Sequence, residues 1–209
     1  MKKQIIFLIC IATFAILNTA ELNVSAGLTF PKMSNSEEAS DGTIGFNAGI
    51  SMLSDTNKAI IFEPGVRFKN MRFYYEESYS DDDFGYNAFT SVTTNFNYID
   101  IFAKVKFNPL QSIETNVKMF PFVGLSMGIF QNGNIKLNYD GEHIAYTTKL
   151  NLKDYVNSPI LGISIGMDLL VNKAYTVGFE YNQALNSIIE DHTQRSNTIL
   201  LNFGYLFTF

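Results

Sequence analysis

The chain has 209 residues, of which 46% are hydrophobic, 17% charged and 14% aromatic, with a formal net charge of −5 and one cysteine. The length fits one domain. The high aromatic content excludes a disordered polymer, and the acidic balance argues against non-specific binding to nucleic acid, so we expect no nucleic-acid partner. A single cysteine excludes a disulfide scaffold and a cysteine-rich zinc site.

The first twenty residues have the pattern of an export signal. Two lysines precede an apolar run over 5–17, and Ala20 supplies a small residue at the expected cleavage point. The apolar run is too short for a membrane-spanning helix. We therefore expect a signal peptide over 1–20 and a single domain over 21–209.

Eight later segments alternate between bulky apolar side chains and small or polar ones, which is the period of a β-strand. In the last segment, for example, Leu201 and Phe203 alternate with Asn202 and Gly204. The predicted strands cover residues 22–30, 44–52, 60–69, 98–107, 122–129, 161–169, 175–182 and 199–209.

The connections between these segments alternate in length, which is typical of outer-membrane barrels. The shorter connections are 54–58, 108–118 and 171–174, and the longer ones are 31–43, 70–91, 131–158 and 184–196. Aromatic residues gather at the strand ends, which predicts two girdles at the lipid–water boundaries. The predicted girdles are Phe30, Tyr74, Tyr75, Phe130 and Tyr181 on one side, and Phe62, Phe107, Phe120, Tyr175 and Phe209 on the other.

The predicted fold class is an all-β, eight-stranded, antiparallel up-and-down transmembrane barrel. Strands in lipid must close into a ring because no water is present to satisfy their backbone groups. An eight-stranded barrel is narrow, so the glycine-rich face should line the lumen, and Ile101, Leu125 and Phe203 should face lipid. The alternative is a soluble exported lipocalin-like ligand carrier, with its apolar face inside.

Pro64 lies within the third predicted strand, where it cannot donate a ladder hydrogen bond. We expect either a β-bulge at Pro64, or a register that places the missing N–H at a wide pair.

Three tracts resemble a known family. The C-terminal run 202–209 ends on an aromatic residue, as the assembly signals of bacterial outer-membrane barrels do. The tracts 120–128 and 175–185 are similar to the fifth and seventh strands of the PorT-like, porin-family outer-membrane β-barrel domain. The resemblance implies a barrel in a Gram-negative outer membrane, in contact with its lipid and recognised by the barrel-assembly machinery through Phe209. It implies no single activity.

Charged residues on the lumen-facing side of the strands are balanced in sign. Unpaired buried charge is costly, so we expect them to form an ion-pair network that fills the lumen. A proton or ion path is the alternative. The predicted network consists of Glu63, Arg67, Lys69, Asp100, Lys104, Lys106, Asp168 and Glu180.

An acidic segment at Glu76, Glu77, Asp81, Asp82 and Asp83 is a possible cation-binding loop. It lacks the glycine and terminal glutamate of an EF-hand, and charge runs are usually solvated. We therefore assign no metal and no cofactor. The outer rim that it would form is acidic, which favours a cationic external partner.

Histidine and serine side chains raise the possibility of a lipid-modifying outer-membrane enzyme. His143 and His192 both fall in predicted loops, the latter near Ser187 and Ser196. A nucleophile and its base must be in hydrogen-bond contact, and nothing in the sequence brings these groups together. We therefore predict a structural or loop-mediated binding role without catalysis.

Overall fold

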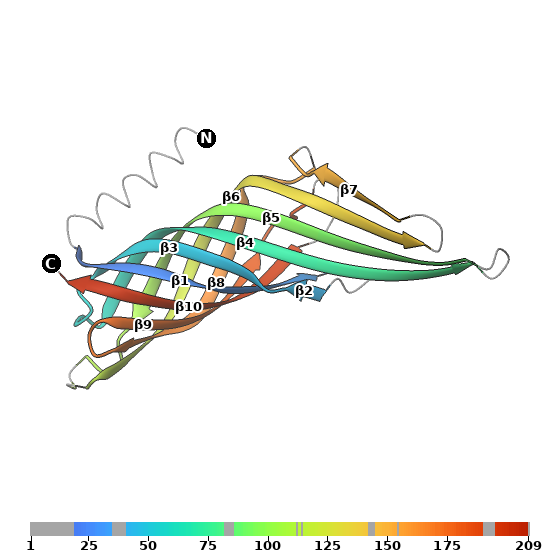
Figure 1. Cartoon of the computed structure of the whole chain (residues 1–209). Coiled ribbons are helices and arrows are strands. Elements are labelled where there is room, and N and C mark those ends of the chain that lie inside the picture. Colours follow the sequence, from blue (N-terminus) through green and yellow to red (C-terminus); the bar gives the residue numbers. More distant parts are fainter. Residues whose placement is uncertain are drawn as a thin grey trace.

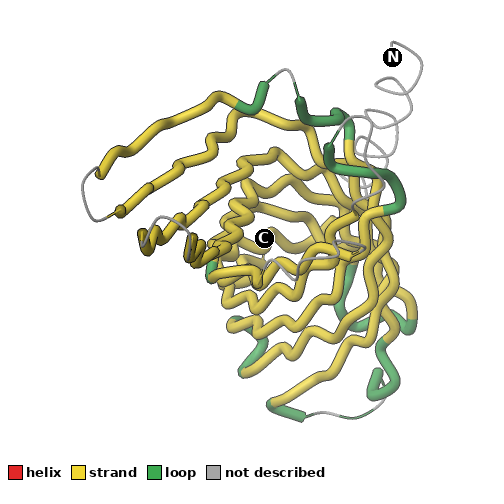
Figure 2. The backbone as a smooth tube through the Cα atoms, turned by 90° about the vertical axis from the view of Figure 1, so that its right-hand side faces the viewer, coloured by secondary structure: helices red, strands yellow, loops and turns green. Residues whose placement is uncertain are grey.

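The computed structural model describes residues 19–34, 41–81, 86–111, 113, 115–141, 145–153, 155–189 and 195–208, and all regular structure in them is strand (Figure 2). No helix in these ranges is long and apolar enough to cross a membrane. The strands are β1 (Thr19–Ser34), β2 (Asp41–Thr43), β3 (Gly45–Ser54), β4 (Ile60–Asp81), β5 (Tyr86–Phe107), β6 (Val117–Gly141), β7 (Ala145–Asn151), β8 (Ile160–Val171), β9 (Tyr175–Ala184) and β10 (Arg195–Thr208).

Eight of these strands form a closed antiparallel ring in the order β4-β3-β1-β10-β9-β8-β6-β5, and β4 pairs with β5 to complete it. The first and last strands pair directly, from Glu21↔Thr208 to Ser34↔Arg195. Closure gives backbone N–H and C=O groups of the strands hydrogen-bond partners, which lipid cannot supply. The predicted eight-stranded barrel is therefore confirmed, with β2 and β7 as additional short strands outside the ring.

The apolar face of each strand is turned outward, as predicted. Leu125 is 65% exposed and Phe203 is 60% exposed, whereas Asp100 in the lumen is fully buried. Ile101 alternates with Asp100 along β5 and so lies on the outward face. A soluble carrier needs the opposite orientation, so this arrangement excludes the lipocalin-like alternative.

The two ends of the barrel differ. The start of β1, the end of β10 and the connections 55–59, 108–116 and 172–174 lie at one end, which we call the turn end (Figure 1). At the opposite end, the loop end, β4 and β5 extend well past β1, β3 and β10 (Figure 1).

Much of the two longest predicted loops is strand. β4 and β5 remain paired from Ile60↔Phe107 to Asp81↔Tyr86, so only 82–85 connects them. β6 likewise continues to Gly141 and pairs with β7. The prediction of loops over 70–91 and 131–158 is therefore wrong for 70–81, 86–91, 131–141 and 145–151, because outside lipid the ladder continues without needing an apolar face. We call the part of β4, β5, β6 and β7 beyond the barrel the protruding sheet.

Of the two alternatives expected at Pro64, the bulge does not occur, because the β4–β5 register runs through Pro64↔Ala103 without a shift. The N–H of Phe62 donates to Ser54 Oγ, which places the even-numbered N–H groups of this segment on the β3 side. The ladder with β3 ends at Ser51↔Gly65, next to Pro64. The N–H that Pro64 lacks would therefore point toward β3, at a position where the pairing of β4 with β3 has already ended.

Candidate functional site: the barrel lumen

The lumen at mid-height holds all eight charged residues predicted to face it. Three come from β4 and three from β5, because side chains two residues apart share one face of a strand. The register places Arg67 opposite Asp100 and Glu63 opposite Lys104. β8 contributes Asp168 and β9 contributes Glu180 from across the ring.

Arg67 is the centre of the larger ion-pair cluster. Its Nη1 and Nη2 atoms each donate to Glu180 at 2.8 Å, a bidentate arrangement, and its Nε lies 3.3 Å from Asp100 Oδ2. Lys69 Nζ lies 2.9 Å from Asp100 Oδ2, and Lys104 Nζ lies 3.0 Å from Glu180 Oε2. Charge-assisted, bidentate bonds of this kind are among the strongest side-chain contacts in a protein.

Lys106 joins two carboxylates in a second cluster nearer the turn end. Its Nζ lies 2.7 Å from Glu63 Oε2 and 2.6 Å from Asp168 Oδ2. Ser51 Oγ donates to Glu63 Oε1 at 2.5 Å. The first cluster has three cations and two anions and the second has one cation and two anions, so the lumen as a whole is neutral in these eight groups.

Aromatic rings in the lumen pack against the cations. Lys104 Nζ is 4.3 Å from the centroid of Phe122 and 5.2 Å from that of Phe102. The guanidinium of Arg67 also lies over Phe102, at 5.1 Å. The negative face of each ring partly replaces water around a buried cation.

Two lumen glycines leave room for carboxylates. A Cβ on Gly128 would lie 2.8 Å from Asp100 Oδ1, and one on Gly178 would overlap Asp168 Oδ1. These small residues explain how a narrow barrel holds so many long charged side chains, as its size requires.

The space left beside the ion pairs is small. A cavity of about 30 Å³ lies next to Glu63, Arg67 and Asp168, and one of about 10 Å³ lies next to Asp100 and Tyr98. Asp100 Oδ1 is buried and has no hydrogen-bond partner among the described residues. A water molecule needs roughly 10–15 Å³ of such volume, so these cavities suit single waters rather than a ligand.

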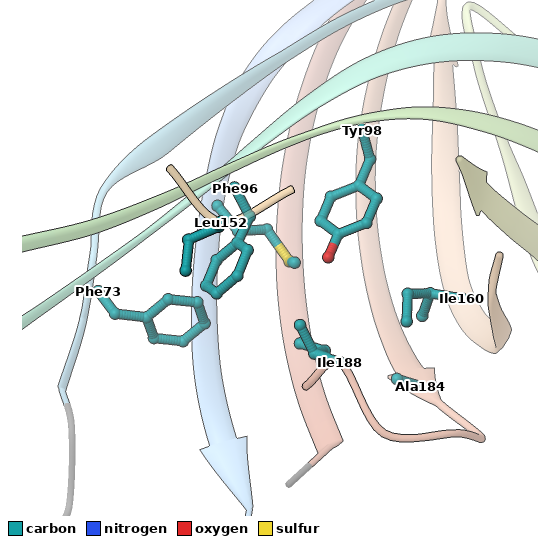
Figure 3. Close-up of a cluster of buried hydrophobic side chains, with 8 residues drawn as sticks. Phe73, Phe96, Tyr98, Leu152, Ile160, Ala184 and Ile188 are labelled. Carbon is teal, nitrogen blue, oxygen red and sulfur yellow. The ribbon is translucent and has the colours of Figure 1, made fainter. Parts of the chain in front are cut away.

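Apolar clusters close the lumen on both sides of the ion pairs. Toward the loop end, Figure 3 shows the rings of Phe73, Phe96 and Tyr98 with Leu152 and Ile188. Toward the turn end, a second buried cluster consists of Leu53, Ile61, Phe120, Leu170 and Leu206.

These clusters were missed by the sequence interpretation, which placed Phe120 in an exposed girdle. Phe120 is 2% exposed and points into the lumen together with Phe122, two residues further along β6. The assignment of Phe120 is therefore wrong. A usable signal did exist, because Ile61 and Leu206 interrupt the small or polar faces of their strands at the turn end.

The possible cation-binding segment is not a loop over 76–81, because Glu76, Glu77 and Asp81 belong to β4. Glu76 is exposed, the side chains of Glu77 and Asp81 are not described, and Asp82 and Asp83 lie outside the described residues. Within the described part of the chain, no group of three or more His, Cys, Asp or Glu side chains is placed to hold a metal ion.

The histidines of the enzyme alternative, His143 and His192, also lie outside the described residues. Of the serines, Ser196 is buried, and the Oγ of Ser187 donates to the Ile189 carbonyl at 2.8 Å.

The family described as outer membrane protein beta-barrel domain matches residues 14–190. No curated protein matches the chain. Among solved structures, the attachment invasion locus protein Ail of Yersinia pestis is 14% identical, with 90% of this chain and 99% of that chain covered and a TM-score of 0.47. Neisserial surface protein A is 16% identical, with 88% and 96% covered and a TM-score of 0.47. The family match spans most of the closed ring, and the chain therefore belongs to the outer membrane protein β-barrel domain family and resides in the outer membrane.

Proposed function

We propose that this protein is a non-catalytic, non-conducting barrel that presents its protruding sheet outside the cell as a binding surface. Outer-membrane barrels have short turns on the periplasmic side and longer loops outside, so the loop end faces outward. The observation that carries the proposal is the continuation of β4 and β5 as a paired ladder to Asp81↔Tyr86, beyond the apolar belt. Ordered backbone outside lipid can present side chains in fixed positions, as binding surfaces require.

The lumen supports the part of the proposal that says the barrel does not conduct ions. Ion pairs, flanked on each side by buried apolar residues, leave cavities of about 30 and 10 Å³. Passage of a hydrated ion would require separation of buried charge pairs, which costs several kcal/mol. Purified protein in planar lipid bilayers should therefore show no stable conductance steps, and reproducible steps would contradict a closed lumen.

A shortened variant tests the role of the protruding sheet. Replacement of residues 76–91 by Asn-Gly leaves Tyr75↔Val92 as the closing pair of a two-residue hairpin, for which Asn-Gly is favoured. The barrel should still form and shift its mobility between unboiled and boiled samples in detergent gels. Gram-negative cells displaying the full chain should adhere to immobilised extracellular proteins, and cells with equal amounts of the shortened chain should not. Equal adhesion by both would contradict the proposal.

We further propose that the export signal ends at Ala20 and that the assembly machinery recognises Phe209. β1 has a register irregularity between Thr19 and Glu21, so regular pairing with both neighbours begins at Glu21. Sequencing of the protein isolated from outer membranes should give Glu21 as its first residue. A start within 1–19 would contradict this cleavage point. The proposed binding role does not depend on the PorT-like resemblance, which remains a prediction.

A further inference from the structure

The outward face of the barrel changes from apolar to polar at one level near the loop end. Ile99 of β5 is opposite Ile129 of β6 in the last apolar row of these strands. The following row is a chain of amides, in which Asn70 Nδ2 donates to Asn97 Oδ1 at 2.7 Å and Asn97 Nδ2 donates to Asn132 Oδ1 at 2.6 Å. This row marks the boundary between hydrocarbon and lipid headgroups on β4, β5 and β6.

Two lysines lie directly opposite each other on the same face beyond this boundary. Lys136 of β6 is paired with Lys149 of β7. Their face is the outward one, because the adjacent Ile135 packs toward the lumen cluster to which Leu152 also belongs. Directly opposite side chains on paired strands have Cβ atoms about 5 Å apart, and like charges in that position repel.

Arg72 extends this basic patch along the neighbouring row. It is exposed on β4, on the side opposite to the buried Met71 and Phe73. Across β4, β5, β6 and β7, neither of the two rows that hold the three cations contains an acidic residue. The rows are Tyr74-Thr93-Lys136-Lys149 and Arg72-Asn95-Asn134-Asn151. On β2, Asp41 is opposite Tyr74 and diagonal to Arg72, three strands away from Lys136.

The nearest acidic side chain described on this face is Glu76. It lies one row further out, at the β4 end of the sheet, two strands away from Lys136. Among the described residues, none of the three cations forms an ion pair with a carboxylate, in contrast to the cations of the lumen. A chain of negative net charge therefore has three neighbouring cations on one outward face, just above its lipid-facing surface.

We infer that Arg72, Lys136 and Lys149 form a binding site for the phosphate group of an outer-leaflet lipid. The site is continuous with the apolar belt that contacts the acyl chains of the same lipid, which is why a lipid is favoured over a free anion. A phosphate between Lys136 and Lys149 would offset their repulsion, and the neighbouring asparagine amides supply further donors. The inference rests on the outer-membrane location and not on the proposed binding role of the protruding sheet.

Native mass spectrometry of the full protein in neutral detergent tests the inference, with phosphatidic acid as probe and phosphatidylcholine of the same chain lengths for comparison. Phosphatidic acid should bind in preference, and more weakly as salt rises. Substitution of both lysines, K136Q/K149Q, should weaken its binding about thirty-fold, since each basic side chain near an anionic surface contributes ~1 kcal/mol. The control is K58Q/K173Q, which removes two exposed lysines at the turn end and should bind as the parent does.

The charge-conserving variant K136R/K149R separates loss of charge from loss of folding and should retain binding. Heat-modifiable migration on gels verifies that each variant is folded. The inference is overturned if K136Q/K149Q binds phosphatidic acid as tightly as the parent, if the control loses as much, or if the two lipids bind equally. Displacement of phosphatidic acid by an equal concentration of inorganic phosphate would overturn the assignment to a lipid.

Discussion

Glu180→Gln is the most informative single substitution in the lumen. The carboxylate accepts two 2.8 Å bonds from Arg67 and lies 3.0 Å from Lys104, and its side chain is 1% exposed. Its cluster has three cations and two anions, and the substitution leaves three cations with Asp100 as the single anion. Removal of one partner from a buried ion pair typically costs about 3–5 kcal/mol.

Urea titration of the folded barrel measures this cost. The chain has no tryptophan, so the folded fraction is best read from unboiled detergent gels. At a slope of about 2 kcal/mol per molar urea, a loss of ~4 kcal/mol lowers the midpoint by roughly 2 M. Glu76→Gln makes the same chemical change at an exposed position and should shift stability by less than about 0.5 kcal/mol.

A double-mutant cycle with Lys104→Gln identifies the origin of the loss. The double variant leaves Arg67 and Lys69 with Asp100, which restores the net charge of the native cluster. Its destabilisation should be smaller than the sum of the two single effects by about 1–3 kcal/mol. Additive effects, or an unchanged midpoint for Glu180→Gln, would refute the view that mutual charge compensation stabilises the lumen.

Three further outcomes follow from packing and from the C-terminus. Phe120→Ala should cost about 3–5 kcal/mol in urea titration because it empties a buried site, whereas Phe203→Ala should cost less, since lipid can fill the exposed position. Gly178→Ala should cost about 1–3 kcal/mol because its Cβ would overlap Asp168, and it should cost less in an Asp168→Ser background, where the overlapping carboxylate is absent. Deletion of Phe209 should lower the heat-modifiable amount in outer membranes, with refolding in detergent unaffected; equal amounts in membranes would contradict a role in assembly.

Alternation along the strands predicted the barrel only together with the lengths of the connections and the aromatic residues at the strand ends. Which face points outward was predicted from size, because a narrow eight-stranded ring has no room inside for the bulky apolar face. The alternation does explain why the lumen charges could be identified, because each of them lies on the small or polar face of its strand, as Glu180 does beside Gly178 and Asn182. Which of them would meet could not be predicted. Arg67 and Glu180 are 113 residues apart, and their contact depends on how strands from opposite sides of the ring face each other across the lumen.

The protruding sheet could not be predicted for a different reason. Beyond the boundary near Asn97, both faces of a strand may be polar, so the period that reveals a strand in lipid is lost. A segment such as 76–81 therefore reads as a loop although it is paired along its length. Phe120 was misplaced because an aromatic side chain at a strand end fits equally a girdle or an apolar cluster inside the lumen.

Direct pairing of β1 with β10 has a consequence for biogenesis. β1 is synthesised about 170 residues before its partner β10, so the ring cannot be completed until β10 has been synthesised. Until then, β1 has an unpaired backbone edge that favours aggregation. The unfolded polypeptide must consequently be kept apart from other chains until it reaches the membrane, and insertion into the bilayer has to be coupled to the late pairing of β1 with β10.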